Sequence, residues 1–151
     1  MTSISNAPEQ PRFSLEASLV ARDRGAFPQW LDAFLRGPGS NIPLADGLAK
    51  QQRWWLGPNE LPLASLKLKC GPGLEFHEPE QDWTRRIEAI ANEVRGGLVL
   101  PPLVAEYAAG KLLIADGNHR HGGLQLARTT HYWTAIWFNS KEDFGLYTSG
   151  R

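Results

Sequence analysis

The chain has 151 residues, of which 42% are hydrophobic, and its formal net charge at pH 7 is zero. This size and composition indicate one globular domain with its own core, and no stretch approaches the roughly 18 apolar residues of a membrane-spanning helix, so membrane insertion is excluded. The charge also disfavours nonspecific nucleic-acid binding, which needs a run of lysines and arginines, whereas a single nucleotide needs only a local cluster of donors.

The N-terminus has neither the basic start nor the apolar core of a secretion signal. We therefore expect a cytoplasmic protein whose first dozen residues form a frayed tail. Cys70 is the single cysteine of the chain and cannot form an internal disulfide, which agrees with a reducing compartment.

Two helices are predicted near the N-terminus. Residues 14–23 favour the first, with Ser14 as its N-cap. The second has Pro28 in its first turn and Gly37 as a left-handed cap. Its large apolar side chains recur at helical spacing: Phe27, Trp30, Leu31, Phe34 and Leu35. This face is too large to leave in water, so it is expected to pack on the rest of the chain or to form a homodimer.

The stretch of residues 37–60 is rich in glycine, proline and asparagine, and we interpret it as an ordered arm with a short helix over residues 44–51. Trp54 and Trp55 lie near its end, where one ring can pack and the other can cover a site. We assign residues 1–60 to a helical N-terminal extension that packs on a domain formed by residues 61–151.

The domain is expected to begin with an edge strand over residues 61–66, where apolar residues alternate and a proline is tolerated. A helix follows the acidic stretch, with Asp82 as its cap and Gly96 at its end. The face of this helix that carries Trp83 is apolar and is assigned to the core. Arg85 and Arg86 follow the helix start and are assigned to its solvated face, with phosphate binding as the alternative role.

Two further strands, residues 103–107 and 111–115, are predicted to pair antiparallel through a three-residue turn that ends at Gly110. A helix and a last strand over residues 132–138 follow. Together these elements predict an α+β fold, with a small mixed sheet flanked by helices.

The helix after the hairpin is expected to begin within two residues of His119 and to end near Arg128. Gly122 and Gly123 weaken it by about 1 kcal/mol each relative to alanine, which indicates either close packing or a ligand. His121 is expected to face solvent.

The junction between the hairpin and this helix is the best candidate for a binding site. An apolar strand runs through Asp116 into Gly117, and Asn118, His119 and Arg120 follow without a loop. A helix start presents unpaired N–H groups and about half a positive charge, and a planar guanidinium can hold two oxygens. The junction therefore predicts a phosphate site, and the local sequence fits an ordinary glycine turn equally well.

The order of elements over residues 61–138 resembles the ParB/sulfiredoxin superfamily. The specific parts are residues 101–104 before the hairpin, residues 115–120 after it and residues 133–138 as the final strand. Members bind nucleotide phosphates at this turn, so the resemblance implies a site for ATP or CTP, with Mg²⁺. The implied site residues are Asp116, which would orient the turn or contact Mg²⁺, and Gly117, Asn118, His119 and Arg120.

The resemblance does not choose among nucleotide hydrolysis, phosphotransfer to a small molecule and other activities. Sulfiredoxins, which repair oxidised peroxiredoxins, carry a reactive cysteine where this chain has Asn118, so repair is not expected. Some relatives phosphorylate free serine and place a catalytic glutamate in the acidic loop. This implies Glu75 or Glu78 as a general base or Mg²⁺ ligand, and the sequence does not separate the two. A solvated acidic loop is the default interpretation.

No metal site of the protein's own is predicted, because the four histidines lack the paired spacing of a helical zinc motif and Cys70 has no cysteine partner. The alternative to nucleotide binding is a noncatalytic ParB-like adaptor for DNA or protein. Arg120→Ala is expected to remove nucleotide binding and to leave the fold intact, because Arg120 is the permanent cation of the turn.

Overall fold

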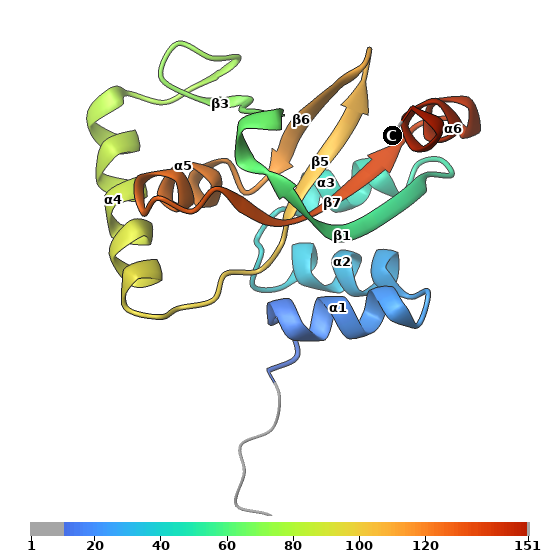
Figure 1. Cartoon of the computed structure of the whole chain (residues 1–151), viewed down its shortest axis with the longest axis horizontal. Helices are drawn as coiled ribbons and strands as arrows, with labels where there is room; N and C mark the ends of the chain where they lie inside the picture. Colours follow the sequence, from blue (N-terminus) through green and yellow to red (C-terminus); the bar gives the residue numbers. More distant parts are fainter. Residues whose placement is uncertain (1–10, 151) are drawn as a thin grey trace, which may run out of the picture.

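A five-stranded sheet lies at the centre of the computed structural model, which describes residues 11–150 (Figure 1). The strands are β1 Trp54–Pro62, β2 Leu66–Lys67, β5 Leu103–Ala108, β6 Lys111–Asp116 and β7 His131–Phe138. They lie in the order β1-β7-β5-β6-β2, with antiparallel β1/β7 and β5/β6 pairs and parallel β7/β5 and β6/β2 pairs. This mixed sheet and its flanking helices confirm the α+β class. Most of the expected N-terminal tail lies outside the described residues.

The strand β1 begins well before the edge strand predicted for residues 61–66, and that prediction is wrong. Only the last two residues of β1 fall in the predicted range, and a 3₁₀ turn, Leu63–Ser65, follows them. Gly57 and Pro58 lie where the pairing register with β7 shifts, so a bulge interrupts the strand without ending it. As a result, β1 runs across the boundary placed between residues 60 and 61.

The hairpin of β5 and β6 is antiparallel, as predicted. Its turn has two residues rather than three, because Ala108 still pairs with Lys111. Ala109 and Gly110 have φ angles of 51° and 78°. Two successive positive φ angles are the geometry of type I′ turns, which are common in two-residue hairpins.

Three helices, α1 Leu15–Asp23, α2 Phe27–Arg36 and α3 Ile42–Leu48, lie on one side of the sheet. Ser14 caps α1 as predicted, since its hydroxyl accepts a hydrogen bond from Ala17 N at 3.1 Å. The apolar face of α2 is buried against alternate residues of β5 and β7: Val104, Ala135 and Trp137. Gly37 has φ −113°, so the predicted left-handed cap is wrong. The short helix α3 begins before the predicted residue 44 and ends before residue 51.

The helices α4 Glu80–Arg95, α5 Asn118–Leu126 and α6 Lys141–Ser149 contribute to the core on the opposite face, which includes Leu103, Ile136 and Phe138. The helix α4 begins before the predicted cap Asp82, and its N-cap is Pro79. The helix α6 was not predicted, although Ser140 caps it by accepting a hydrogen bond from Asp143 N at 3.0 Å.

The helices α4 and α5 lie side by side (Figure 1), and two glycines allow their close contact. A Cβ atom on Gly122 would lie 2.7 Å from Cγ2 of Ile87, and one on Gly123 would lie 2.4 Å from Cγ2 of Ile90. Both distances are shorter than van der Waals contact, so Gly122 and Gly123 serve helix packing, one of the two roles left open by the sequence.

A small parallel sheet of β3 Cys70–Gly71 and β4 Phe76–His77 lies between β2 and α4 in the chain.

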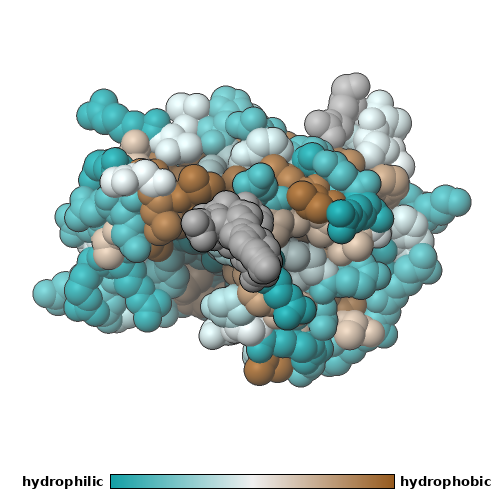
Figure 2. All heavy atoms as spheres, turned by 90° about the horizontal axis from the view of Figure 1, so that it is seen from below, coloured by the Kyte–Doolittle hydropathy of each residue, from teal (hydrophilic) through white to brown (hydrophobic). Residues whose placement is uncertain are grey.

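Figure 2 shows one face of the molecule, which is mainly hydrophilic and on which apolar side chains form separate patches. Among the helices of residues 11–150, none has the length and apolar character needed to cross a membrane.

Candidate functional site

The helix α5 begins at Asn118, directly after β6, as predicted. Gly117 is its N-cap, with φ 105° and no side-chain cap. The first intrahelical hydrogen bond is donated by His121 N to Gly117 O at 2.8 Å. The N–H groups of residues 118–120 therefore lie at a helix start that no side chain caps. A Cβ atom at Gly117 would lie 2.7 Å from Cδ2 of Leu103 and 2.9 Å from Nη2 of Arg120. Both the positive φ and this crowding therefore require glycine here.

The side chain of Arg120 extends toward the end of β6 and the segment before β5. Its Nη2 donates to Asp116 Oδ2 at 3.1 Å and to Pro102 O at 3.0 Å. The other oxygen of Asp116 accepts a hydrogen bond from Asn41 Nδ2 at 3.1 Å. Asp116 is buried with both oxygens engaged, an arrangement that suits orientation of the turn, the first of its two expected roles. Nε of Arg120 is buried and has no hydrogen-bond partner among the described residues.

The side chain of Asn118 connects the turn to β3. Its Oδ1 accepts hydrogen bonds from Lys69 N at 2.8 Å and from Cys70 N at 3.2 Å. Its Nδ2 donates to Ile114 O at 3.3 Å. These three bonds to the backbone hold the segment around Cys70 against the start of α5, a structural role that the sequence did not indicate.

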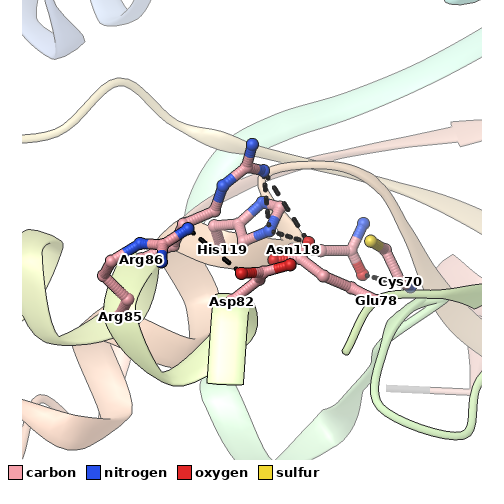
Figure 3. A network of polar contacts seen from close by, with 7 residues as sticks. All are labelled: Cys70, Glu78, Asp82, Arg85, Arg86, Asn118 and His119. Carbon is pink, nitrogen blue, oxygen red and sulfur yellow. Dashed lines mark hydrogen bonds and ion pairs between the residues drawn. The ribbon is translucent and has the colours of Figure 1, made fainter. Parts of the chain in front are cut away.

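His119 lies between Glu78 and Arg86 (Figure 3). Its Nε2 is 2.7 Å from Glu78 Oε2 and 3.3 Å from Nη1 of Arg86. One ring nitrogen cannot donate to the carboxylate and accept from the guanidinium at once. The shorter contact requires a proton on Nε2 that His119 donates to Glu78. Arg86 then interacts with Glu78 as an ion pair at 3.7 Å. The ring of Trp83 lies 5.0 Å from the His119 ring, between centroids.

The structure separates the two candidate acids. Glu75 is exposed in the turn between β3 and β4, whereas the side chain of Glu78 is 14% exposed and contacts His119. Oε1 of Glu78 is buried and has no hydrogen-bond partner among the described residues. Glu78 is therefore the expected acid that the fold brings to the turn.

Two arginines that are adjacent in the sequence have different surroundings. Arg85 pairs with Asp82 at 3.1 Å on the exposed side of α4, as expected of a solvated face. Arg86 points toward His119 instead (Figure 3). His121, expected to face solvent, is 3% exposed and its Nε2 donates to Leu63 O at 2.8 Å, so that prediction is wrong. The reason is that the buried face of α5 includes position 121.

Cys70 is a member of the site that sequence reasoning missed. Its sulfur, a carboxylate oxygen of Glu78 and a ring nitrogen of His119 all lie within 4.8 Å of one another. Burial raises the pKa of the Cys70 thiol, the charge of Glu78 raises it further, and Arg86 lowers it. No sequence motif predicts the cluster of Cys70, Glu78 and His119, because the three residues come from separate segments of the chain.

No protein-family model and no curated protein matches this chain. Among solved structures it is similar to the C-terminally truncated chromosome-partitioning protein ParB from Caulobacter crescentus, complexed with CTP-gamma-S. The two are 20% identical, with a TM-score of 0.38, over 66% of this chain and 51% of that one. This chain thus spans about half the length of that structure.

Proposed function

We propose that the start of α5 binds the phosphates of a nucleoside triphosphate, ATP or CTP. The observation that carries the proposal is the uncapped first turn after Gly117, with Arg86 and His119 beside it. Unpaired N–H groups and the positive end of the helix dipole attract an anion, and the nearby cation adds to that attraction. The family resemblance of residues 115–120 supports the same ligand.

The side chains would divide the work. The N–H groups of Asn118, His119 and Arg120 donate to phosphate oxygens, and Gly117 leaves room for the approach. Arg86, whose side chain is 59% exposed, is the guanidinium that would reach the phosphates. Arg120 contributes positive charge from the β6 side of the turn, and its ion pair with Asp116 holds the guanidinium in place.

A transfer step, to water or to a small hydroxyl compound, would use Glu78. A general base must lie within hydrogen-bond reach of the proton that it takes; Glu78 lies at the turn beside His119, whereas both oxygens of Asp116 are already engaged. Its unpartnered Oε1 also offers a hard oxygen ligand to Mg²⁺ that enters with the nucleotide.

The test is a thermal-shift panel of ATP, CTP, GTP and ADP with Mg²⁺, followed by calorimetry. A ligand at 100 times its Kd adds about 2.7 kcal/mol to the free energy of unfolding. Arg86→Ala is expected to weaken binding by roughly ten- to a hundredfold, because it removes a charged hydrogen-bond donor. Arg85→Ala is the matched control and should bind as the parent does. Absence of any nucleotide response would contradict the proposal and favour the adaptor.

Arg120→Ala also tests the phosphate site, provided that the unfolding free energy of the variant is measured together with its nucleotide affinity. Loss of this cation leaves the buried carboxylate of Asp116 unpaired at the turn, and this negative charge is expected to weaken nucleotide binding by roughly thirty- to more than a hundredfold. The same change also removes the bonds to Asp116 and to Pro102 O, so the unfolding free energy of the variant should fall as well. Binding as tight as that of the parent would place the phosphates elsewhere.

A further inference from the structure

Three side chains with different donor atoms meet beside the start of α5. Cys70 comes from β3, Glu78 precedes α4, and His119 lies in the first turn of α5. Their sulfur, oxygen and nitrogen atoms lie within 4.8 Å of one another. In a tetrahedral zinc site, ligands bound at about 2.0–2.3 Å are separated by about 3.3–3.6 Å, so small side-chain shifts bring these three to ligand positions.

We propose that Cys70, Glu78 and His119 bind a Zn²⁺ ion through three protein ligands and leave a fourth position open. A thiolate, an imidazole and a carboxylate are the donor types that zinc takes, and the thiolate selects against Mg²⁺ and Ca²⁺, which prefer oxygen. The sequence lacks a zinc motif because the fold, and not a local repeat, brings these donors together.

A second observation points to a cation at this place. Oε1 of Glu78 is buried and accepts no hydrogen bond within the described part of the chain, although an ionised carboxylate has room for several. Glu78 Oε2 shares one proton with His119 at 2.7 Å. A metal ion in place of this proton would bond to His119 Nε2 and to the carboxylate of Glu78, and binding through both carboxylate oxygens would also give Oε1 a partner.

The surroundings of the cluster favour this arrangement. Asn118 fixes the backbone of Cys70 by accepting its N–H, so the thiol is held beside the turn. Cys70 is partly exposed, which gives an ion access from solvent. Arg86 opposes a cation, but it is exposed and holds Glu78 only at 3.7 Å, so its flexible side chain can turn away.

The experiment uses the full chain, freed of metal by a chelator and measured without nucleotide. Zn²⁺ titration by calorimetry should show one site, and Co²⁺ as a substitute should give the near-ultraviolet thiolate-to-cobalt absorption together with the visible bands of a tetrahedral ion. Absence of the thiolate band in the folded parent would overturn the proposal without any variant.

Cys70→Ser should weaken Zn²⁺ binding by more than the roughly 10–100-fold cost of losing a residue that only supports a ligand. It should also abolish the cobalt band, whereas His131→Ala, which removes an exposed histidine at the start of β7, should leave both unchanged. Equal Zn²⁺ affinity of Cys70→Ser and the parent would refute the site.

The inference stands apart from the proposed nucleotide function, although the two share Glu78 and His119. None of the contacts proposed for the nucleotide involves Cys70, so Cys70→Ser should keep the nucleotide response while it loses Zn²⁺. A protein that binds Zn²⁺ but no nucleotide would contradict the proposed function alone, and the reverse would contradict the zinc site alone.

Discussion

The layer between α2 and the sheet and the turn at the start of α5 are built from opposite kinds of contact. In the first, apolar and aromatic side chains exclude water, as in the stacked rings of Trp30 and Phe34, whose centroids are 5.2 Å apart. In the second, charged groups are half-buried, and Oε1 of Glu78 and Nε of Arg120 have no partner among the described residues. Stability is therefore concentrated in the apolar layer, and the polar groups that the proposed binding needs lie at the turn.

The largest expected effect lies in the apolar layer. Leu35 is 0% exposed, so Leu35→Ala leaves a cavity and should lower the unfolding free energy by about 2–5 kcal/mol. Chemical denaturation measures this, and Leu146→Ala, at a residue that is 65% exposed, is the control with a change within about 0.5 kcal/mol. Zn²⁺ and nucleotide affinities of folded Leu35→Ala should match those of the parent. A loss of affinity comparable to the loss of stability would show that the apolar layer and the turn are energetically coupled.

The next effect concerns the contact between α4 and α5. Gly123→Ala should lower stability by about 1–3 kcal/mol, because the new methyl group overlaps Ile90. Ile90→Ala in the same chain should relieve part of this cost, so a double-mutant cycle should show a favourable coupling energy. Gly145→Ala is the control, since nothing lies within 4 Å of its Cβ position, and it should be neutral or stabilising. Additive effects of the first two changes would show that the helices do not press on each other there.

A smaller effect is expected at Asn118. Asn118→Ala removes three hydrogen bonds and leaves the N–H groups of Lys69 and Cys70 without their acceptor, at a cost of about 1–2 kcal/mol. Zn²⁺ affinity should fall with stability, because Cys70 is no longer held. Asn118→Asp retains the acceptor oxygen and should lose less of both. If Asn118→Ala lowered stability and left Zn²⁺ affinity unchanged, the link between this side chain and the cluster would be absent.

The smallest effect is a pH dependence from His121. Burial lowers its pKa, and the hydrogen bond to the Leu63 carbonyl raises it by less. The unfolded chain takes up a proton as the pH falls through about 6.5, while the folded chain takes it up only at lower pH. Stability from the neutral imidazole is therefore present above about pH 6.5 and is lost as the pH falls toward the folded pKa. His121→Gln should flatten this part of the stability profile, measured by denaturation from about pH 8 to about pH 5. An unchanged slope would assign the pH dependence to other groups.

Short sequence patterns predicted the elements whose structure depends mainly on neighbouring residues. The hairpin of β5 and β6 followed from two alternating strands around Gly110, and the start of α5 followed from the junction at Gly117. The strand β1 was missed because Gly57 and Pro58 indicate a loop, whereas pairing with β7 continues on both sides of their bulge. Tertiary pairing outweighed the local preference of these two residues.

The site was predictable only in part, for a similar reason. Residues 116–120 were proposed as site residues because they are contiguous, and Glu78 was one of two acids that the resemblance implied. Cys70 was not assigned to the site, and Arg86 was assigned to it only as an alternative, since each reaches it through packing between segments that are distant in the sequence. The Ser140 cap of α6 was a local signal that was present and overlooked.

The tight fit of α5 on α4 carries a consequence for natural variation. Arg86 lies in α4, Glu78 lies just before the N-cap of α4, and His119 lies in α5, so the gap between the helix axes affects the 2.7 Å contact of Glu78 with His119. Added bulk at positions 122 or 123 would push the axes apart, and about 1 Å of separation exceeds what a hydrogen bond tolerates. Related chains that keep the polar cluster should therefore show size compensation, with larger residues at 122 and 123 accompanied by smaller ones at 87 and 90.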